Sequence, residues 1–199
     1  MIRYIVILTL FSAPFGTVAD IDGNTYQTIQ IGSKTWMAEN LRVSHYNNGD
    51  ELPAGYTNSE WANLNSSQTG AYAVYEDTPA NIEIYGNLYN WYAVDDDRGI
   101  CPEGWYIPSD DEYKLLEMYL GMSESEANTT YWRGTDEGGK LKEETLEHWN
   151  SPNTGATNES GFTGLPGGAR DSNGSYFNEG GGGYYWTSST NFSNDAWYR

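Results

Sequence analysis

Carboxylates are the most numerous groups in this sequence that could do chemistry, with 28 Asp and Glu residues. Two of them on either side of a glycosidic bond can hydrolyse it, one as general acid and the other as base or nucleophile. The residues considered for this role are Asp95, Asp96, Asp97, Asp110, Asp111, Glu143 and Glu144. No spacing among them selects a pair, and a capped helix, solvated turns and an acidic surface account for the same residues. We therefore predict a non-catalytic domain with no catalytic residue.

Cys101 is the only cysteine in the chain. A nucleophilic cysteine needs a base beside it, and His45 and His148 are the only histidines. Pro102 and the turn at Gly104 favour a structural role for Cys101 instead. An unpaired cysteine in an exported protein is a free thiol, forms an intermolecular bridge, or has lost its partner.

Metal binding is not indicated by any ligand spacing, so we predict no cofactor and no metal. Calcium is the alternative ion, because it takes oxygen ligands from Asp, Asn and backbone carbonyls on flexible loops. The acidic run 95–97 does not have the spacing of an EF-hand loop.

Aromatic residues are unusually frequent, with 8 Trp and 17 Tyr. This is more than a core of this size needs, so we expect some rings at the surface, where they can stack on sugars or anchor protein interfaces. The alternative is that they fill a core rich in loops. A binding surface needs rings beside polar groups on a rigid hairpin. The predicted ligand-binding set is Trp149, Tyr176, Tyr184, Tyr185, Asn191, Asn194 and Asp195.

The start of the chain predicts export. Arg3 is followed by an apolar run over 4–15 and by small residues up to Ala19, which is typical of a secretory signal peptide over 1–19. The run is shorter than the roughly 20 residues of a membrane span, so we expect no stable membrane anchor. The formal net charge of −18 disfavours nucleic acid and anionic membranes as partners. We predict a secreted or cell-surface protein with one domain over 20–199.

Turn residues and periodicity predict an α+β fold. The clearest helix spans 109–120, because Ser109 and Glu112 form a capping box and Gly121 provides a stop. Further helices are predicted at 123–129 and from 139 to 144, and strands at 26–31 with 34–37, 71–75, 162–165, 176–177 and 184–188. The polar segment 47–69 is predicted to be a long loop, 84–94 to be either strand or helix, and 180–183 to be a hairpin loop. The result is a small irregular antiparallel sheet with one or two helices and long loops.

The final residues look like the opening of a strand, with no turn after it. We therefore expect the natural sequence to continue beyond Arg199 and this domain to be truncated.

Five separated motifs in order carry a family resemblance. They are Gly32 with Lys34–Leu41, Tyr85–Ala93, Cys101–Asp110, Gly161 and Phe162 with Leu165–Gly168 and Arg170, and Tyr185–Ser189. Together they resemble the Fibrobacter succinogenes major paralogous domain, a family of exported bacterial proteins of unknown function. The resemblance implies a C-type lectin-like fold. Within these motifs we predict structural roles for Cys101, Trp105, Ser109, Phe162, Arg170 and Trp186, with Arg170 pairing with a carboxylate to fix its loop.

The resemblance also implies features that this sequence lacks. Family members continue to a final strand whose second cysteine resembles a partner for Cys101, and this chain ends before it. Formylglycine-generating enzymes, similar in fold, use paired cysteines to bind copper, so one cysteine argues against that oxidase activity. Lectins of this superfamily bind calcium through a proline-containing triplet and an Asn–Asp pair, which 151–153 and 194–195 resemble only loosely.

Together these observations predict an exported recognition module that binds a glycan or an extracellular protein surface through aromatic-rich loops. The alternatives are an extracellular hydrolase and a structural or adhesive surface component. The oligomeric state is left open.

Overall fold

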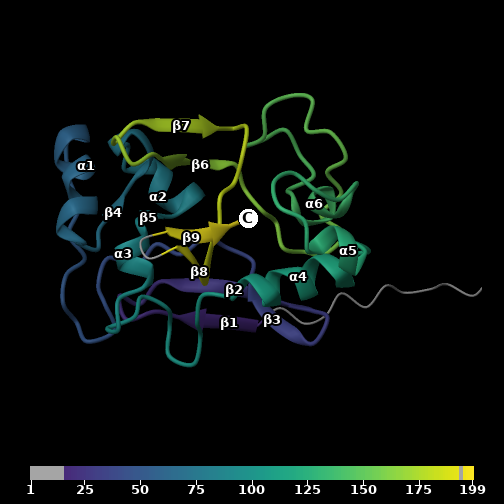
Figure 1. The fold of residues 1–199 in the computed structure, drawn as a ribbon, viewed down its shortest axis with the longest axis horizontal. Helices are drawn as coiled ribbons and strands as arrows, with labels where there is room; N and C mark the ends of the chain where they lie inside the picture. The colour runs from purple at the N-terminus through teal and green to yellow at the C-terminus, as the bar shows by residue number, and fades with distance from the viewer. Residues whose placement is uncertain (1–15, 193–194) are drawn as a thin grey trace, which may run out of the picture.

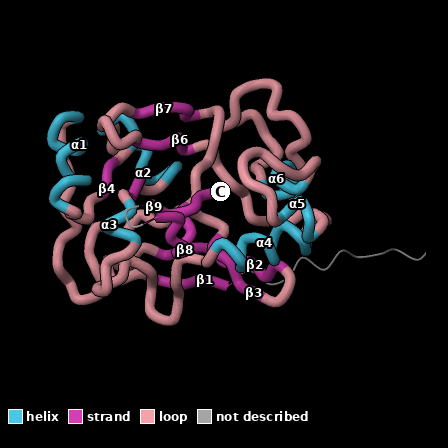
Figure 2. The backbone as a smooth tube through the Cα atoms, in the orientation of Figure 1, coloured by secondary structure: helices cyan, strands magenta, loops and turns pink. Residues whose placement is uncertain are grey.

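The computed structural model describes residues 16–192 and 195–199 of the chain. The helices are α1 (Asn58–Ser67), α2 (Ala80–Tyr85), α3 (Trp91–Val94), α4 (Asp110–Tyr119), α5 (Glu124–Ala127) and α6 (Glu137–Leu141), with a 3-10 turn at Tyr75–Asp77. The strands are β1 (Gly16–Ala19), β2 (Thr25–Ile31), β3 (Lys34–Met37), β4 (Tyr72–Ala73), β5 (Leu88–Tyr89), β6 (Gly167–Arg170), β7 (Tyr176–Glu179), β8 (Trp186–Phe192) and β9 (Asp195–Tyr198). Long loops join these elements (Figure 2).

The strands form small antiparallel sheets, ordered β1-β2-β3, β4-β5, β6-β7 and β8-β9. In Figure 1 the β8–β9 hairpin lies between the three-stranded sheet and the β6–β7 hairpin, with α1 at one end of the molecule and α4, α5 and α6 at the other. The α+β class expected from the sequence is confirmed, with several small sheets in place of one. Among the described residues, no helix combines the length and apolar character needed to cross a bilayer.

Helix α4 begins where the sequence predicts it. The Ser109 hydroxyl accepts a hydrogen bond from the Glu112 backbone N–H at 3.2 Å, and the Glu112 carboxylate accepts one from the Ser109 N–H at 2.9 Å. Both bonds satisfy N–H groups that the first turn of a helix leaves without partners. One face of α4 then packs on β2 and β3. The buried residues of this core are Ile29, Ile31, Trp36, Tyr113, Leu116 and Leu120.

Two further apolar clusters support the other end of the molecule. One contains Val43, Tyr46, Leu52, Ala93 and Ile100, and the other contains Trp61, Leu64, Ala71 and Ala73. The second joins α1 to β4, so it anchors a helix that the sequence analysis did not expect.

The prediction of a long loop over 47–69 is wrong, because α1 occupies Asn58–Ser67. Thr57 caps this helix and forms a capping box with Glu60. The face of α1 that carries Trp61 and Leu64 is buried, so the helix is held by two large side chains rather than by a sustained apolar stripe.

The predicted strand at 162–165 is also wrong. Thr163 has φ of +57°, a left-handed conformation that interrupts an extended strand, and only Gly164 makes a bridge, with Lys142. The strand lies further on, in β6, where Arg170 was expected to lie in a loop. The segment 84–94, predicted as either strand or helix, contains the end of α2, then β5 and α3.

The hairpin loop predicted at 180–183 is wrong, because β7 before it pairs with β6 and β8 after it pairs with β9, so the glycine run joins two different sheets. The other predicted helices and strands are present with shifted bounds. The hairpin of β2 and β3 has Ile29 opposite Trp36. Helix α5 carries a capping box from Ser123 to Glu126, whereas α6 starts at Glu137, before the predicted position. The predicted signal peptide falls mainly on residues 1–15, which lie outside the described residues. Its last four residues, 16–19, form β1.

Candidate binding site

The candidate site lies where the β6–β7 hairpin meets β8 and β9. A run of four glycines, 180–183, lets these strands approach closely. A Cβ at Gly183 would lie 2.7 Å from the Leu165 carbonyl oxygen, and a Cβ at Gly181 would lie 2.3 Å from the Asn178 side chain. Only glycine fits such approaches without a shift of the neighbouring atoms. The glycine run therefore fixes the aromatic residues on either side of it.

Five rings follow one another across this junction, and we name them the aromatic ladder: Phe177, Tyr184, Tyr198, Trp186 and Trp91. Successive ring centroids lie 5.5, 6.0, 6.4 and 5.9 Å apart, with interplanar angles of 63°, 53°, 84° and 53°. These are favourable tilted and edge-to-face geometries. The ladder is exposed at Phe177 and Tyr198, whose exposed fractions are 42% and 59%, and buried at Trp91. It therefore runs from the surface into the interior.

Hydrogen bonds hold the ladder in place. The Trp186 indole N–H donates to the Tyr89 carbonyl oxygen at 2.8 Å, which joins β8 to β5. The Tyr184 hydroxyl accepts a 2.8 Å hydrogen bond from the Asn178 side-chain amide. Since Asn178 and Phe177 are neighbours on β7, ring and amide come from one rigid hairpin.

A cleft of about 740 Å³ opens beside the ladder. Its walls include the ladder residues together with polar side chains from Asn65, Asn87, Asn90, Arg170, Asp171 and Ser172. Asp171 and Ser172 are exposed. Aromatic rings beside a few polar groups in a concave site are typical of small-molecule and saccharide recognition.

Arg170 in the cleft wall serves the fold. Its guanidinium carbon lies 4.4 Å from the Trp61 ring centroid and 4.8 Å from that of Tyr176. Its Nη2 donates to the Tyr56 carbonyl at 2.7 Å and its Nε to the Gly174 carbonyl at 3.0 Å. Arg170 therefore fixes its loop through backbone carbonyls and rings, and not through the carboxylate that the sequence analysis expected.

The predicted ligand-binding residues are dispersed. Tyr184 lies in the ladder and Asn191 is exposed on β8. Tyr176 contacts the Tyr75 ring and donates a hydrogen bond to Asp77. Burial is the main cause, and this hydrogen bond the second cause, that raises the pKa of Tyr176 to about 12. Asn194 lies outside the described residues, and Asp195 begins β9.

Trp149 and Tyr185 are used inside the fold. The Trp149 indole donates to the Gly164 carbonyl at 3.1 Å, and Lys142 lies over its ring at 4.3 Å. Tyr185 packs edge-to-face on Phe162, and burial raises the pKa of Tyr185 to about 12. Neither residue lies on the exposed part of the ladder.

The residues with predicted structural roles lie in or beside the cores. Phe162 packs against Trp36, with ring centroids 6.4 Å apart. Burial raises the pKa of the Cys101 thiol to about 11. Cys101 and Trp105 both line a second cavity, of about 820 Å³. Ser109 caps α4, and Trp186 belongs to the ladder.

Four residues of the ladder and its hydrogen bonds were not predicted from the sequence: Trp91, Phe177, Asn178 and Tyr198. The signal that could have found Phe177 is the two-residue period of side chains along β7, directly before the glycine run. Phe177 follows Tyr176 on β7, and neighbours on a strand face opposite sides.

The carboxylates considered for catalysis are in ion pairs or exposed. Asp96 pairs with Arg98 at 2.7 Å, and this hydrogen bond is the main cause that lowers the pKa of Asp96. Burial alone would raise the pKa of Asp110, but hydrogen bonds and charge from Lys114 and Arg199 outweigh it, so the pKa is lowered. A glycosidase general acid needs a raised pKa. Both shifts run in the opposite direction.

Ser44, His45 and Asp22 lie together but do not form a catalytic triad. His45 Nδ1 is 2.6 Å from Asp22 Oδ1 and 3.3 Å from Ser44 Oγ. A triad uses one ring nitrogen for the carboxylate and the other for the nucleophile. Because both contacts here involve Nδ1, the ring cannot relay a proton between them.

The comparisons with known proteins agree with the resemblance seen in the sequence. The family model of the Fibrobacter succinogenes major domain matches residues 29–199. No curated protein and no solved structure matches the chain.

Proposed function

The chain belongs to the Fibrobacter succinogenes major domain family, and we propose that this member is an exported, non-catalytic recognition module that binds a neutral glycan at the aromatic ladder. Export rests on the N-terminal apolar run that ends before Asp20. We include a C-type lectin-like fold in the proposal, supported by a capped helix packed on small antiparallel sheets and by the long loops between them.

The observation that carries the proposal is the row of exposed rings beside the cleft. Phe177 and Tyr198 are exposed on either side of Tyr184. Large apolar rings on a soluble protein normally turn inward, and a fixed exposed set marks an interaction surface. A sugar presents an apolar C–H face to a ring and hydroxyls to polar neighbours. The ladder offers the rings, and Asn178 and Ser172 offer polar groups.

The charge of the protein selects between kinds of glycan. A formal net charge of −18 repels uronate-rich and sulfated polymers at ordinary ionic strength. Neutral hexose or pentose polymers carry no charge, so the protein does not repel them. We therefore propose neutral polysaccharides as the first ligands to test.

The test is binding of the whole purified chain to a glycan array, followed by calorimetry on the best neutral oligosaccharide. We expect saturable binding without release of reducing ends. Tyr198→Ala and Phe177→Ala are each expected to weaken it about 10-fold, or roughly 1.4 kcal/mol per ring lost. Repeating the titration with calcium and with EDTA tests the calcium alternative.

Trp132→Ala is the matched control, because the Trp132 ring is 99% exposed and lies outside the cleft. It should bind as the wild-type chain does, and thermal melts should show that every variant is folded at the temperature of the titration. A silent array, or equal binding by Tyr198→Ala and wild type, would reject the glycan site. Release of product would favour the hydrolase.

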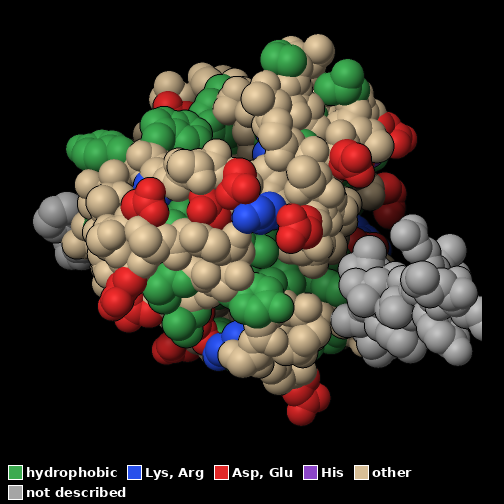
Figure 3. Space-filling view, turned by 90° about the vertical axis from the view of Figure 1, so that its right-hand side faces the viewer, with side chains coloured by type: hydrophobic (Ala, Val, Ile, Leu, Met, Phe, Trp, Pro, Cys, Tyr) green, Lys and Arg blue, Asp and Glu red, His purple; other side chains and the backbone are tan. Residues whose placement is uncertain are grey.

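A second candidate function rests on a different surface. Leu115, Tyr119, Tyr131 and Trp132 are all more than half exposed, at 55%, 65%, 92% and 99%. Figure 3 faces the end of the molecule where α4, α5 and α6 lie, and shows hydrophobic side chains among acidic ones there. Exposed apolar side chains at this end of the molecule suit contact with another protein in an adhesive surface component. Self-association on a sizing column that Trp132→Ala abolishes, together with a silent array, would favour this function.

A further inference from the structure

A cluster of carboxylate and imidazole side chains lies on the loop after α6, in residues 143–148. The loop is held at several points. The Glu143 N–H donates to the Gly164 carbonyl at 3.1 Å, and the Asn153 side-chain amide donates to the carbonyls of Glu143 and Thr145 at 2.8 and 2.9 Å. The loop has little regular structure, yet its backbone is fixed from outside.

Three side chains converge on this loop: Glu143, Glu147 and His148. His148 Nδ1 lies 2.9 Å from Glu143 Oε1, and one ligand atom from each of the three lies within 4.8 Å of the others. Around a tetrahedral metal with bonds of about 2.0–2.2 Å, the ligand atoms lie roughly 3.3–3.6 Å from one another. Glu147 is exposed, so a change of its side-chain rotamer can bring its carboxylate to that separation.

The orientation of His148 is fixed by packing. Its ring lies edge-on to the Tyr85 ring, with centroids 5.8 Å apart and an interplanar angle of 78°. Its side chain is 22% exposed and that of Glu143 is 13% exposed. Two of the three groups are therefore positioned before any ligand arrives, which lowers the entropy lost on binding.

The Glu143 carboxylate contacts His148 through Oε1 alone. Its Oε2 is out of contact with solvent and has no hydrogen-bond partner among the described residues. The nearby Lys142 ammonium lies over the Trp149 ring instead. A buried carboxylate oxygen without a partner is costly, and a bound cation removes that cost.

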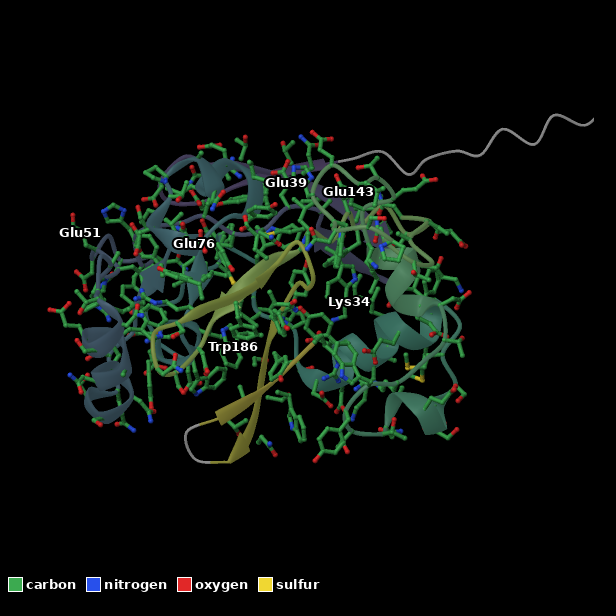
Figure 4. All side chains as sticks on the ribbon, turned by 90° about the horizontal axis from the view of Figure 1, so that it is seen from above. Lys34, Glu39, Glu51, Glu76, Glu143 and Trp186 are labelled. Carbon is green, nitrogen blue, oxygen red and sulfur yellow. The ribbon has the colours of Figure 1, made fainter. Side chains whose placement is uncertain are left out.

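We propose that Glu143, Glu147 and His148 bind one divalent transition-metal ion, with Zn²⁺ as the best fit. An imidazole with two carboxylates suits Zn²⁺, whereas Ca²⁺ takes oxygen ligands alone. Three protein ligands leave a coordination position for water. In Figure 4 Glu143 lies well apart from Trp186 in the aromatic ladder, so this site is separate from the proposed glycan site.

The test is equilibrium dialysis of the whole chain, without a histidine tag, against ZnCl₂ in a buffer that does not chelate metals. We expect one Zn²⁺ per chain at saturation. Both His148→Ala and Glu147→Gln should weaken binding at least about 10-fold. Because Glu147 is exposed, its variant keeps the fold and gives an answer even if replacing His148 perturbs the loop.

Two matched controls separate this site from general affinity for metals. His45→Ala removes the other histidine, which pairs with Asp22, and Glu144→Gln removes an exposed carboxylate beside the site. Both should bind Zn²⁺ as wild type does. No saturable binding by wild type, or equal binding by wild type, His148→Ala and Glu147→Gln, would overturn the assignment.

Discussion

Lys34 on β3 and Glu112 in the first turn of α4 form an ion pair, with Lys34 Nζ 2.6 Å from Glu112 Oε1 (Figure 4 labels Lys34). The Tyr106 hydroxyl donates to the same oxygen at 2.7 Å, while Oε2 accepts from the Ser109 backbone. One carboxylate therefore caps the helix and ties it to the sheet. Burial alone would raise the pKa of Glu112, but these hydrogen bonds outweigh it and lower the pKa to about 2.

A carboxyl whose pKa is lower in the folded than in the unfolded chain stabilises the fold above its unfolded value. For Glu112 that contribution is present above pH 4.5 and is lost as the pH falls towards 2. We expect Glu112→Gln to lower the free energy of unfolding by about 2 kcal/mol at pH 7. The difference from wild type should shrink between pH 4.5 and 2 in urea titrations. A difference that does not change with pH would show that the carboxylate charge is not responsible.

Helix α4 was predictable from sequence because its signals are local. Ser109 and Glu112 are three residues apart and an apolar face follows them. Helix α1 has an equivalent capping box from Thr57 to Glu60, but its sequence is polar and its stability comes from burial of Trp61 against residues far along the chain. Tertiary packing of this kind leaves little trace in a short window of sequence.

The sequence predicts the type of site, a surface of aromatic rings, but not which rings form it. The abundance of aromatic residues indicates exposed rings, but the sequence does not say which side of a strand faces the core. Tyr184 and Tyr185 are neighbours, and only Tyr184 joins the ladder, while Tyr185 packs on Phe162. Trp186 reaches Tyr89, 97 residues away in sequence, and no local pattern encodes that contact.

Two adjacent glycines in α6 provide a matched pair for a packing test. A Cβ at Gly139 would lie 2.0 Å from the Gly155 carbonyl oxygen, whereas a Cβ at Gly138 would meet nothing within 4 Å. We expect Gly139→Ala to destabilise the fold by about 1–3 kcal/mol. Gly138→Ala should be neutral or stabilising by up to about 1 kcal/mol, because alanine favours helix. Thermal melts of both variants check this, and equal melting temperatures would contradict the packing of 155 on α6.

Arg170 joins the β6–β7 hairpin to the start of α1 through two carbonyls and two rings. Lysine keeps the charge and an apolar stem but has one compact ammonium, which cannot serve both carbonyls while lying between the rings. We therefore expect Arg170→Lys to lower the free energy of unfolding by about 1–2 kcal/mol in urea titrations. Full stability in this variant would mean that charge alone suffices at this position.

Cys101 is expected to react slowly, because burial raises the pKa of its thiol to about 11 from 9.0. The thiolate is the reactive form, so at pH 8 its fraction falls roughly 100-fold relative to an exposed thiol. The backbone is fixed here as well, since the Asn47 side-chain amide donates to the Cys101 carbonyl at 2.8 Å. Labelling by a disulfide reagent at pH 8 should therefore be at least about 100-fold slower in the native chain than in guanidinium. Asn47→Ala should speed native labelling by loosening this segment. Rapid labelling of the native wild-type chain would contradict this prediction and show that solvent reaches the partly buried thiol through the cavity that Cys101 lines.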